Sequence, residues 1–125
     1  MARSQDKSRR KASGGRYHSS RSKRKFELTG YAASTKLDAK TKIRTKRTLG
    51  GNRKRSLLAT NIINVSDKKG KTSKTEIINV IENPANPHLV RRNILTKGAI
   101  VETTLGKAKI TSSPGQEGLV NGVLL

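Results

Sequence analysis

The feature that most constrains this chain is an excess of positive charge concentrated in its first half. Residues 1–58 carry 19 Lys and Arg against 3 acidic residues, a net charge of +16, whereas residues 59–125 carry 9 against 5, a net charge of +4. Repulsion between like charges at this density opposes a compact state unless a partner supplies counter-charge. Nucleic acid carries negative charge most densely, so the sequence predicts a nucleic-acid partner rather than a free-standing basic protein.

Several other classes of function are disfavoured by what the chain contains. It has no cysteine, and its two histidines, His18 and His88, have no partner at metal-ligand spacing, so we expect no metal and no cofactor. The acidic residues are scattered in positions expected at strand ends, in turns or on solvent faces, which predicts no catalytic residue and no small-molecule substrate. No apolar run approaches the roughly 18 residues of a membrane span, so no membrane partner is expected.

The N-terminal region, residues 1–40, is predicted to be a basic extended arm that stays disordered until nucleic acid binds. Residues 1–25 contain only four apolar side chains, which cannot offset about 1–2 kcal/mol of backbone entropy per residue. Lys and Arg heads reach phosphate oxygens, and glycines let the backbone approach closely. The candidate contacts in the arm are Lys11, Gly14, Gly15, Arg16, Arg21, Lys23, Arg24 and Lys25.

The remainder, residues 41–125, is predicted to be an all-β body. Its apolar residues are mostly β-branched and come in short runs separated by turn residues. Such a pattern favours a small antiparallel β-barrel-like domain. With two Tyr and one Phe in the chain, the core is expected to be aliphatic.

Individual strands and turns of the body follow from the same pattern. We expect strands over residues 41–49, 57–65 and 76–82, and a hairpin around Gly106 with Ala108 and Ile110 facing inward. The dipeptides Pro114-Gly115 and Asn121-Gly122 predict a turn and a second tight hairpin. Residues 88–95 form the one stretch with a helical pattern.

The first predicted strand of the body and the loop after it are strongly basic. Cations at every second position lie about 7 Å apart on one face of a strand, which suits a row of phosphates, although Lys on a strand also protects a sheet edge from aggregation. Paired glycines followed by cations form a compact phosphate probe, and the same residues also suit a plain hairpin turn. The candidate contacts here are Lys42, Arg44, Lys46, Arg47, Gly50, Gly51, Asn52, Arg53, Lys54 and Arg55.

The choice between RNA and DNA rests on the aromatic residues and on the expected secondary structure. Tyr17, Phe26 and Tyr31 are too few to build base-stacking platforms, so recognition should depend on backbone and shape, as it does for folded RNA. A chromatin-type DNA-binding protein is an alternative, but the chain offers no long helix and no wedge residue. A ribosome-assembly factor is a second alternative.

The order of several motifs resembles the S8e family of archaeal and eukaryotic small-subunit ribosomal proteins, and the length is similar to that of the archaeal form. The resemblance implies a β-barrel-like body, an arm threaded into small-subunit ribosomal RNA, neighbouring ribosomal proteins as partners, a cytoplasmic location in the ribosome, and no catalytic activity. The segments that carry it are Gly14-Gly15-Arg16-Tyr17, residues 21–28, Lys42-Ile43-Arg44-Thr45, Gly50-Gly51-Asn52-Arg53-Lys54, residues 83–91, residues 97–101 and Gly122-Val123-Leu124-Leu125.

Overall fold

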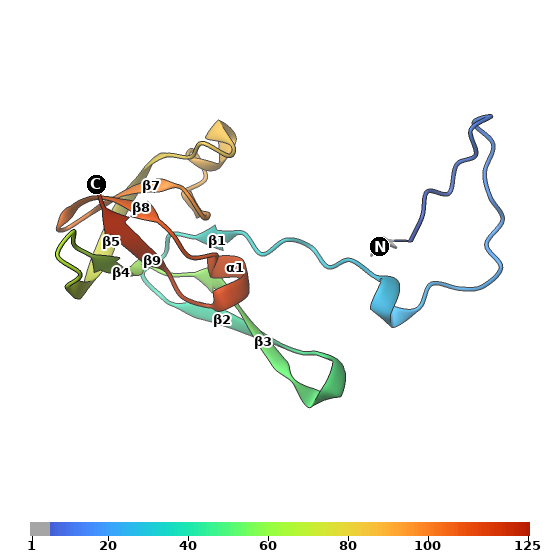
Figure 1. Ribbon diagram of the computed structural model, residues 1–125, viewed down its shortest axis with the longest axis horizontal. Helices are drawn as coiled ribbons and strands as arrows, with labels where there is room; N and C mark the ends of the chain where they lie inside the picture. Colours follow the sequence, from blue (N-terminus) through green and yellow to red (C-terminus); the bar gives the residue numbers. More distant parts are fainter. Residues whose placement is uncertain (1–5) are drawn as a thin grey trace. The chain divides into compact units, whose positions relative to one another are not determined.

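The computed structural model describes residues 6–125, which form two units: an N-terminal segment, residues 6–32, and a body, residues 33–125 (Figure 1). The first five residues of the predicted arm lie outside the described residues. The sequence predicted a boundary between residues 40 and 41, whereas in the structure residues 33–40 belong to the body. The reason is β1 (Thr35–Lys36), a two-residue strand that pairs within the sheet of the body.

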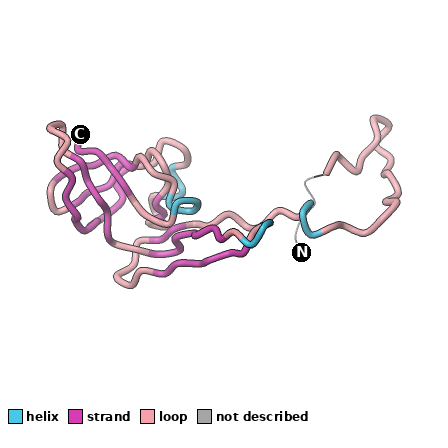
Figure 2. Tube along the Cα trace, turned by 60° about the horizontal axis from the view of Figure 1, so that its bottom comes forward, coloured by secondary structure: helices cyan, strands magenta, loops and turns pink. Residues whose placement is uncertain are grey.

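The body is built almost entirely of strands, and five of them close into a barrel (Figure 2). Four of the barrel pairings are antiparallel, and the pairing between the first and last strands is parallel. Closure leaves no unpaired edge among these strands. The predicted all-β class with a barrel-like body is therefore confirmed. The barrel order is β4 (Ile62–Ser66), β5 (Thr72–Glu82), β7 (Ile100–Thr103), β8 (Gly106–Ile110) and β9 (Asn121–Leu124).

A second, four-stranded sheet lies outside the barrel and was not anticipated from the sequence. Its order is β2 (Lys42–Arg47), β3 (Arg53–Ala59), β1 and β6 (Ile94–Leu95). Strands β2 and β3 form an antiparallel hairpin whose far end projects from the body (Figure 1). Because β2 pairs only with β3, it is an edge strand of this sheet, as the aggregation-protection interpretation of its lysines requires.

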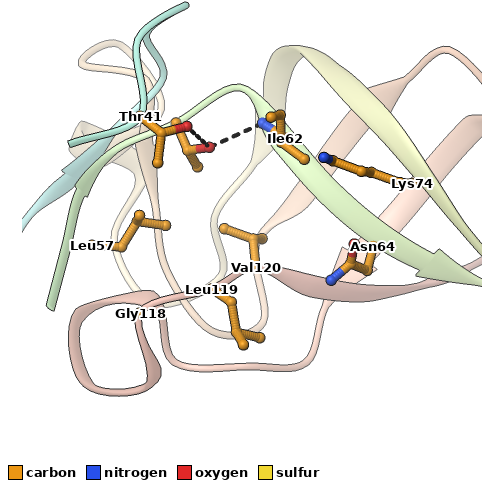
Figure 3. A pocket seen from close by; sticks show the side chains of 9 residues that line it. Thr41, Leu57, Ile62, Asn64, Lys74, Gly118, Leu119 and Val120 are labelled. Atoms are coloured by element: carbon orange, nitrogen blue, oxygen red, sulfur yellow. Dashed lines mark hydrogen bonds between the residues drawn. The ribbon is translucent and has the colours of Figure 1, made fainter. Parts of the chain in front are cut away.

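The chain passes from the sheet to the barrel at Thr60, so the single strand expected over residues 57–65 is wrong: it is divided between β3 and β4. The Thr60 amide donates to the Lys36 carbonyl at 3.1 Å, and its hydroxyl accepts from the Ile62 amide at 3.1 Å, which turns the chain. The junction borders an open cavity of about 320 Å³ whose one charged lining residue is Lys74 (Figure 3).

Two other local predictions are wrong, and each has a tertiary cause. Asn121-Gly122 is not a hairpin turn but the start of β9, where the bare Cα of Gly122 fits against Ile63 and the Lys109 carbonyl. Residues 88–95 do not form one helix, because a short 3₁₀ turn gives way to a left-handed Asn93, φ 49°, before β6. The Pro114-Gly115 turn is the start of a one-turn helix. The helical elements are η1 (Lys25–Glu27), η2 (Leu49–Gly51), η3 (Pro87–Leu89) and α1 (Pro114–Glu117).

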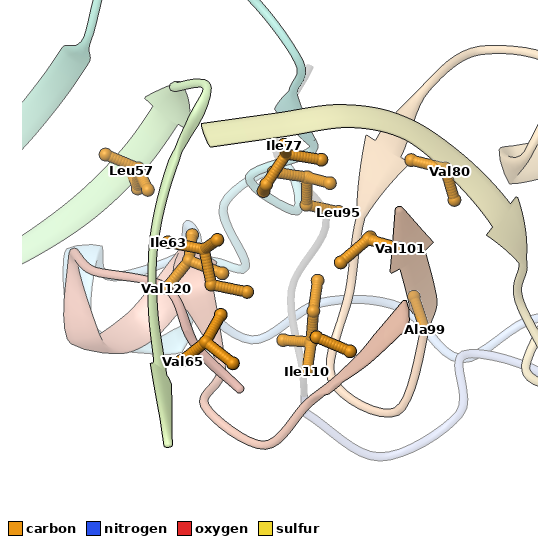
Figure 4. Close-up of a cluster of buried hydrophobic side chains, with 11 residues drawn as sticks. Leu57, Ile63, Val65, Ile77, Val80, Leu95, Ala99, Val101, Ile110 and Val120 are labelled. Carbon is orange, nitrogen blue, oxygen red and sulfur yellow. The ribbon is translucent and has the colours of Figure 1, made fainter. Parts of the chain in front are cut away.

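The core is aliphatic, as predicted, and lies mainly inside the barrel (Figure 4). Ile63, Val65 and Val101 have no exposed surface, and the inward positions predicted for Ala108 and Ile110 are confirmed. All three aromatic side chains are instead exposed. Burial of these apolar side chains, worth about 1.5–3 kcal/mol for each large one, is what stabilises the body.

Candidate nucleic-acid interface

The β2–β3 hairpin brings most of the predicted cationic contacts of the body together. Its register sets Lys46 opposite Lys54 and Arg47 opposite Arg53. Residues that lie opposite each other in an antiparallel pair share a face, and alternate residues along a strand do too. One face of the hairpin therefore carries Arg44, Lys46 and Lys54, and the other carries Arg47, Arg53 and Arg55.

Within the part of the chain that the structure describes, one ion pair involves a cation of β2 or β3. No acidic residue occurs between Asp38 and Asp67 in the sequence. At the base of the hairpin, Lys42 Nζ donates to Asp38 Oδ2 at 3.0 Å, and this hydrogen bond lowers the pKa of the Asp38 carboxyl. A further ion pair joins Arg21 to Glu27, away from the hairpin in sequence. Like charges directly opposite each other destabilise a strand pair, and an anion placed between them would remove this repulsion.

The turn that closes the hairpin is held by its own hydrogen bonds. The Thr48 amide and hydroxyl both donate to the Asn52 carbonyl, at 2.7 and 3.1 Å, and Asn52 Nδ2 donates to the Leu49 carbonyl at 3.3 Å. Gly50 and Gly51 have φ of 74° and 79°, a left-handed backbone that glycine adopts without strain. Asn52 was predicted as a contact residue, and in the structure its side chain orders the turn.

The N-terminal segment holds a second cluster of predicted residues in a small loop. The Lys11 amide donates to the Gly15 carbonyl at 2.7 Å, and Gly14, with φ 85°, donates back to Lys11 at 3.0 Å. A bridge between Arg10 and Arg16 closes the loop. These side chains are all exposed, so the loop presents its cations to solvent.

One aromatic side chain in this loop has a role that the sequence did not suggest. The Tyr17 ring lies 5.5 Å from Lys11 Nζ and 5.7 Å from Lys7 Nζ, measured to the ring centroid. Attraction between an ammonium group and the ring face holds both cations near one point. The sequence signal that could have indicated this role is the position of Tyr17 close to Lys7 and Lys11 along the chain.

The remaining predicted residues of the segment surround η1. Arg21 forms an ion pair with Glu27, whose carboxylate also accepts from the Arg24 amide at 3.3 Å. The hydrogen bond from Arg21 lowers the pKa of Glu27, and the same bond raises the pKa of Arg21. Residues 21–27 carry four cations and one acid, and Lys23, Arg24 and Lys25 are exposed, so this stretch keeps a net positive surface.

The most exposed large apolar side chain of the described residues was not among the predicted site residues. Leu49 lies at the tip of the β2–β3 hairpin with 97% of its surface exposed. An apolar residue directly before Gly50-Gly51 in a basic loop was the signal that could have identified it.

Residues 6–125 show neither a metal-binding cluster nor a membrane-spanning helix. No group of three or more potential ligands is arranged to hold a metal ion. No helix in that part of the chain has the length and apolar character to span a membrane.

A small closed barrel with a projecting cationic hairpin and a basic N-terminal segment defines a nucleic-acid-binding protein that relies on phosphate contacts. Comparison with known proteins gives the family. The family described as ribosomal protein S8e matches residues 4–125, nearly the entire sequence. The chain belongs to this family.

Individual relatives match over the same extent, and each is named small ribosomal subunit protein eS8. The protein from Methanocorpusculum labreanum is 53% identical, with 97% of each chain covered. That from Methanococcus aeolicus is 52% identical, covering 97% of this chain and 95% of its own. That from Methanobrevibacter smithii is 51% identical over the full length of both. The resemblance inferred from the motifs is thereby confirmed.

Proposed function

We propose that this protein is a structural constituent of the small ribosomal subunit that binds and stabilises folded ribosomal RNA. It acts in the cytoplasm, as part of the ribosome, beside neighbouring ribosomal proteins, and it is not an enzyme. Membership in the S8e family and full-length similarity to relatives named as small-subunit proteins support this role.

The observation that carries the proposal is the pair of like-charged contacts across the β2–β3 hairpin. Lys46 opposite Lys54 and Arg47 opposite Arg53 are unfavourable in the free protein, because no acid among the described residues forms an ion pair with them. Phosphate oxygens between or beside these side chains remove that repulsion, and condensed counterions are released from the RNA. Arg adds bidentate hydrogen bonds to phosphate that Lys cannot make.

The N-terminal segment supplies a second set of phosphate contacts in this proposal. The candidates keep their predicted roles: Lys11 and Arg16 in the small loop, and Arg21, Lys23, Arg24 and Lys25 around η1. Gly14 and Gly15 leave room for the backbone of the loop to approach the RNA. Residues 1–32 carry 10 Lys and Arg against 2 acids, so the segment gains most of its order from the bound RNA.

A salt-dependence experiment tests the hairpin assignment. Replacing Arg53, Lys54 and Arg55 together with Ala should flatten the plot of log K against log salt by about two to three units, at roughly 0.7–0.9 per lost phosphate contact. The matched control replaces Lys68, Lys69 and Lys71 with Ala. This change removes the same amount of charge from the β4–β5 loop. Equal slopes for the two variants would mean that net charge, and not the hairpin, sets the salt dependence.

Two alternatives remain distinguishable from this role. A chromatin-type protein should bind duplex DNA as tightly as ribosomal RNA in direct competition. An assembly factor should be absent from translating ribosomes separated on a sucrose gradient. We expect preference for the RNA and co-migration with translating ribosomes.

A further inference from the structure

The tip of the β2–β3 hairpin places one apolar side chain beyond the cations on the two faces of the hairpin. Beyond the Arg47–Arg53 pair, the hydrogen bonds between Thr48 and Asn52 close the turn and leave three residues at its end, Leu49, Gly50 and Gly51. Glycine has no side chain, so Leu49 is the side chain that the tip presents. It is 97% exposed.

This exposure has no explanation in the folding of the protein. Leu49 belongs neither to the buried core nor to the partly buried residues packed against it. The turn needs backbone groups of residue 49, whose carbonyl accepts from Asn52, but it does not need an apolar side chain there. A side chain so exposed gains most from being covered by a partner.

Because the charges around the tip select a polyanion, we propose that Leu49 is an apolar wedge that packs against an unstacked base of the bound RNA. This inference rests on the proposed function. Six cations on the two faces of the hairpin, Arg44, Lys46, Arg47, Arg53, Lys54 and Arg55, direct the tip toward RNA.

The chemistry of RNA explains why a base, and not phosphate, is the target of Leu49. Folded RNA exposes apolar base faces where nucleotides bulge out or a helix ends, and proteins reach such bases with protruding side chains. Apolar residues inserted between bases are a known mode of nucleic-acid recognition. The flanking Arg and Lys bind phosphates on either side, which places the leucine between two backbone segments. The hydrogen bonds of Thr48 and Asn52 hold the backbone of the turn from which the side chain projects.

The test measures binding of the full-length chain to protein-free archaeal small-subunit ribosomal RNA at several salt concentrations. Leu49→Ala should bind about tenfold more weakly at every salt concentration, because burial of a leucine is worth at least that factor. The salt slope should stay unchanged, since leucine releases no counterions. Arg53→Ala, in contrast, should lower the slope by roughly 0.7–0.9.

Leu105→Ala provides the matched control. Leu105 is 51% exposed beside Gly106 in the β7–β8 turn, and its replacement should leave affinity unchanged. Circular dichroism should show all variants folded, because Leu49 makes no core contact. Chemical probing should find one nucleotide whose base becomes more reactive when Leu49→Ala replaces the natural chain.

The outcomes separate the two proposals. If the unaltered chain prefers ribosomal RNA but Leu49→Ala binds equally well, the wedge is excluded and the proposed function stands. The same result together with a crosslink from residue 49 to a protein neighbour would assign Leu49 to a protein contact and overturn the inference. If the unaltered chain shows no preference for ribosomal RNA over duplex DNA, the proposed function itself fails.

Discussion

Arg47 and Arg53 lie directly opposite each other at the last paired position before the turn of the β2–β3 hairpin. Both side chains are exposed, and no acidic residue lies between Asp38 and Asp67 in the sequence to offset them. The repulsion between the two side chains lowers the stability of the free protein, and an anion bound beside them would remove that repulsion. Stability and RNA affinity should therefore respond in opposite directions to a change at this position.

Arg53→Glu tests this opposition. The substitution converts a like-charge pair into an attractive one, and we expect the free energy of unfolding to rise by about 0.2–1 kcal/mol. RNA binding should weaken at the same time, because a phosphate contact becomes a repulsion. Denaturant titration and RNA titration measure the two effects.

Arg53→Gln is the control for that substitution, since it removes the charge without adding attraction. Its stability should fall between those of the unaltered chain and Arg53→Glu. A loss of stability in both variants would show that Arg53 packs against the hairpin in a way that charge alone does not describe.

The glycine at the start of β9 offers a test of barrel packing. A Cβ added to Gly122 would lie 3.0 Å from Ile63 Cδ1 and 3.0 Å from the Lys109 carbonyl oxygen. The carbonyl belongs to the neighbouring strand β8 and cannot move without breaking the ladder. Gly122→Ala should therefore destabilise the protein by about 1–3 kcal/mol, read from the midpoint of denaturant unfolding.

Gly15→Ala is the matched control, because the same methyl group there meets nothing closer than 3.7 Å and φ is not positive. Its unfolding midpoint should match that of the unaltered chain. A barrel that tolerates Gly122→Ala equally well would contradict the tight approach of β4 and β8 to β9.

The features that the sequence predicted correctly depend on neighbours in the chain. The hairpin around Gly106 follows from alternating side chains within a few residues, and Ala108 and Ile110 are buried as that alternation requires. The cationic faces of β2 follow from the same period of two. The charge of the hairpin was visible for the same reason, because composition needs no tertiary information.

The features that the sequence did not predict depend on residues far away. Asn121-Gly122 has the composition of a turn, but its place in β9 is decided by contacts with Ile63 and Lys109. Strand β1 has no local pattern, and it forms by pairing with β3 and β6, while the Thr35 hydroxyl donates to the Leu57 carbonyl at 2.7 Å. The sequence did not predict Leu49 as a site residue, because the exposure of its side chain is visible only once the turn has formed.

The boundary between the two units can be tested with two truncated chains. We propose that a chain beginning at Ala33 keeps the fold of the body, because it retains β1 and the contact of Ala33 with the α1 region, where Gly115 allows close approach. It loses a net charge of +8, from 10 Lys and Arg and 2 acids in residues 1–32. RNA affinity and its salt slope should both fall, by roughly 0.7–0.9 of slope for each phosphate contact that the segment makes.

A chain beginning at Thr41 removes β1 as well and should be less stable than the first truncation by at least about 2 kcal/mol. It loses the buried Thr35 hydroxyl bond to Leu57 and the packing of Leu37 against the core. It also uncovers one side of β3 and β6, whose backbone groups pair with β1. Equal unfolding midpoints for the two truncations would mean that β1 contributes nothing to the body. Unfolding of the chain that begins at Ala33 would mean that residues 1–32 are needed for the body to fold, which would contradict the division into two units.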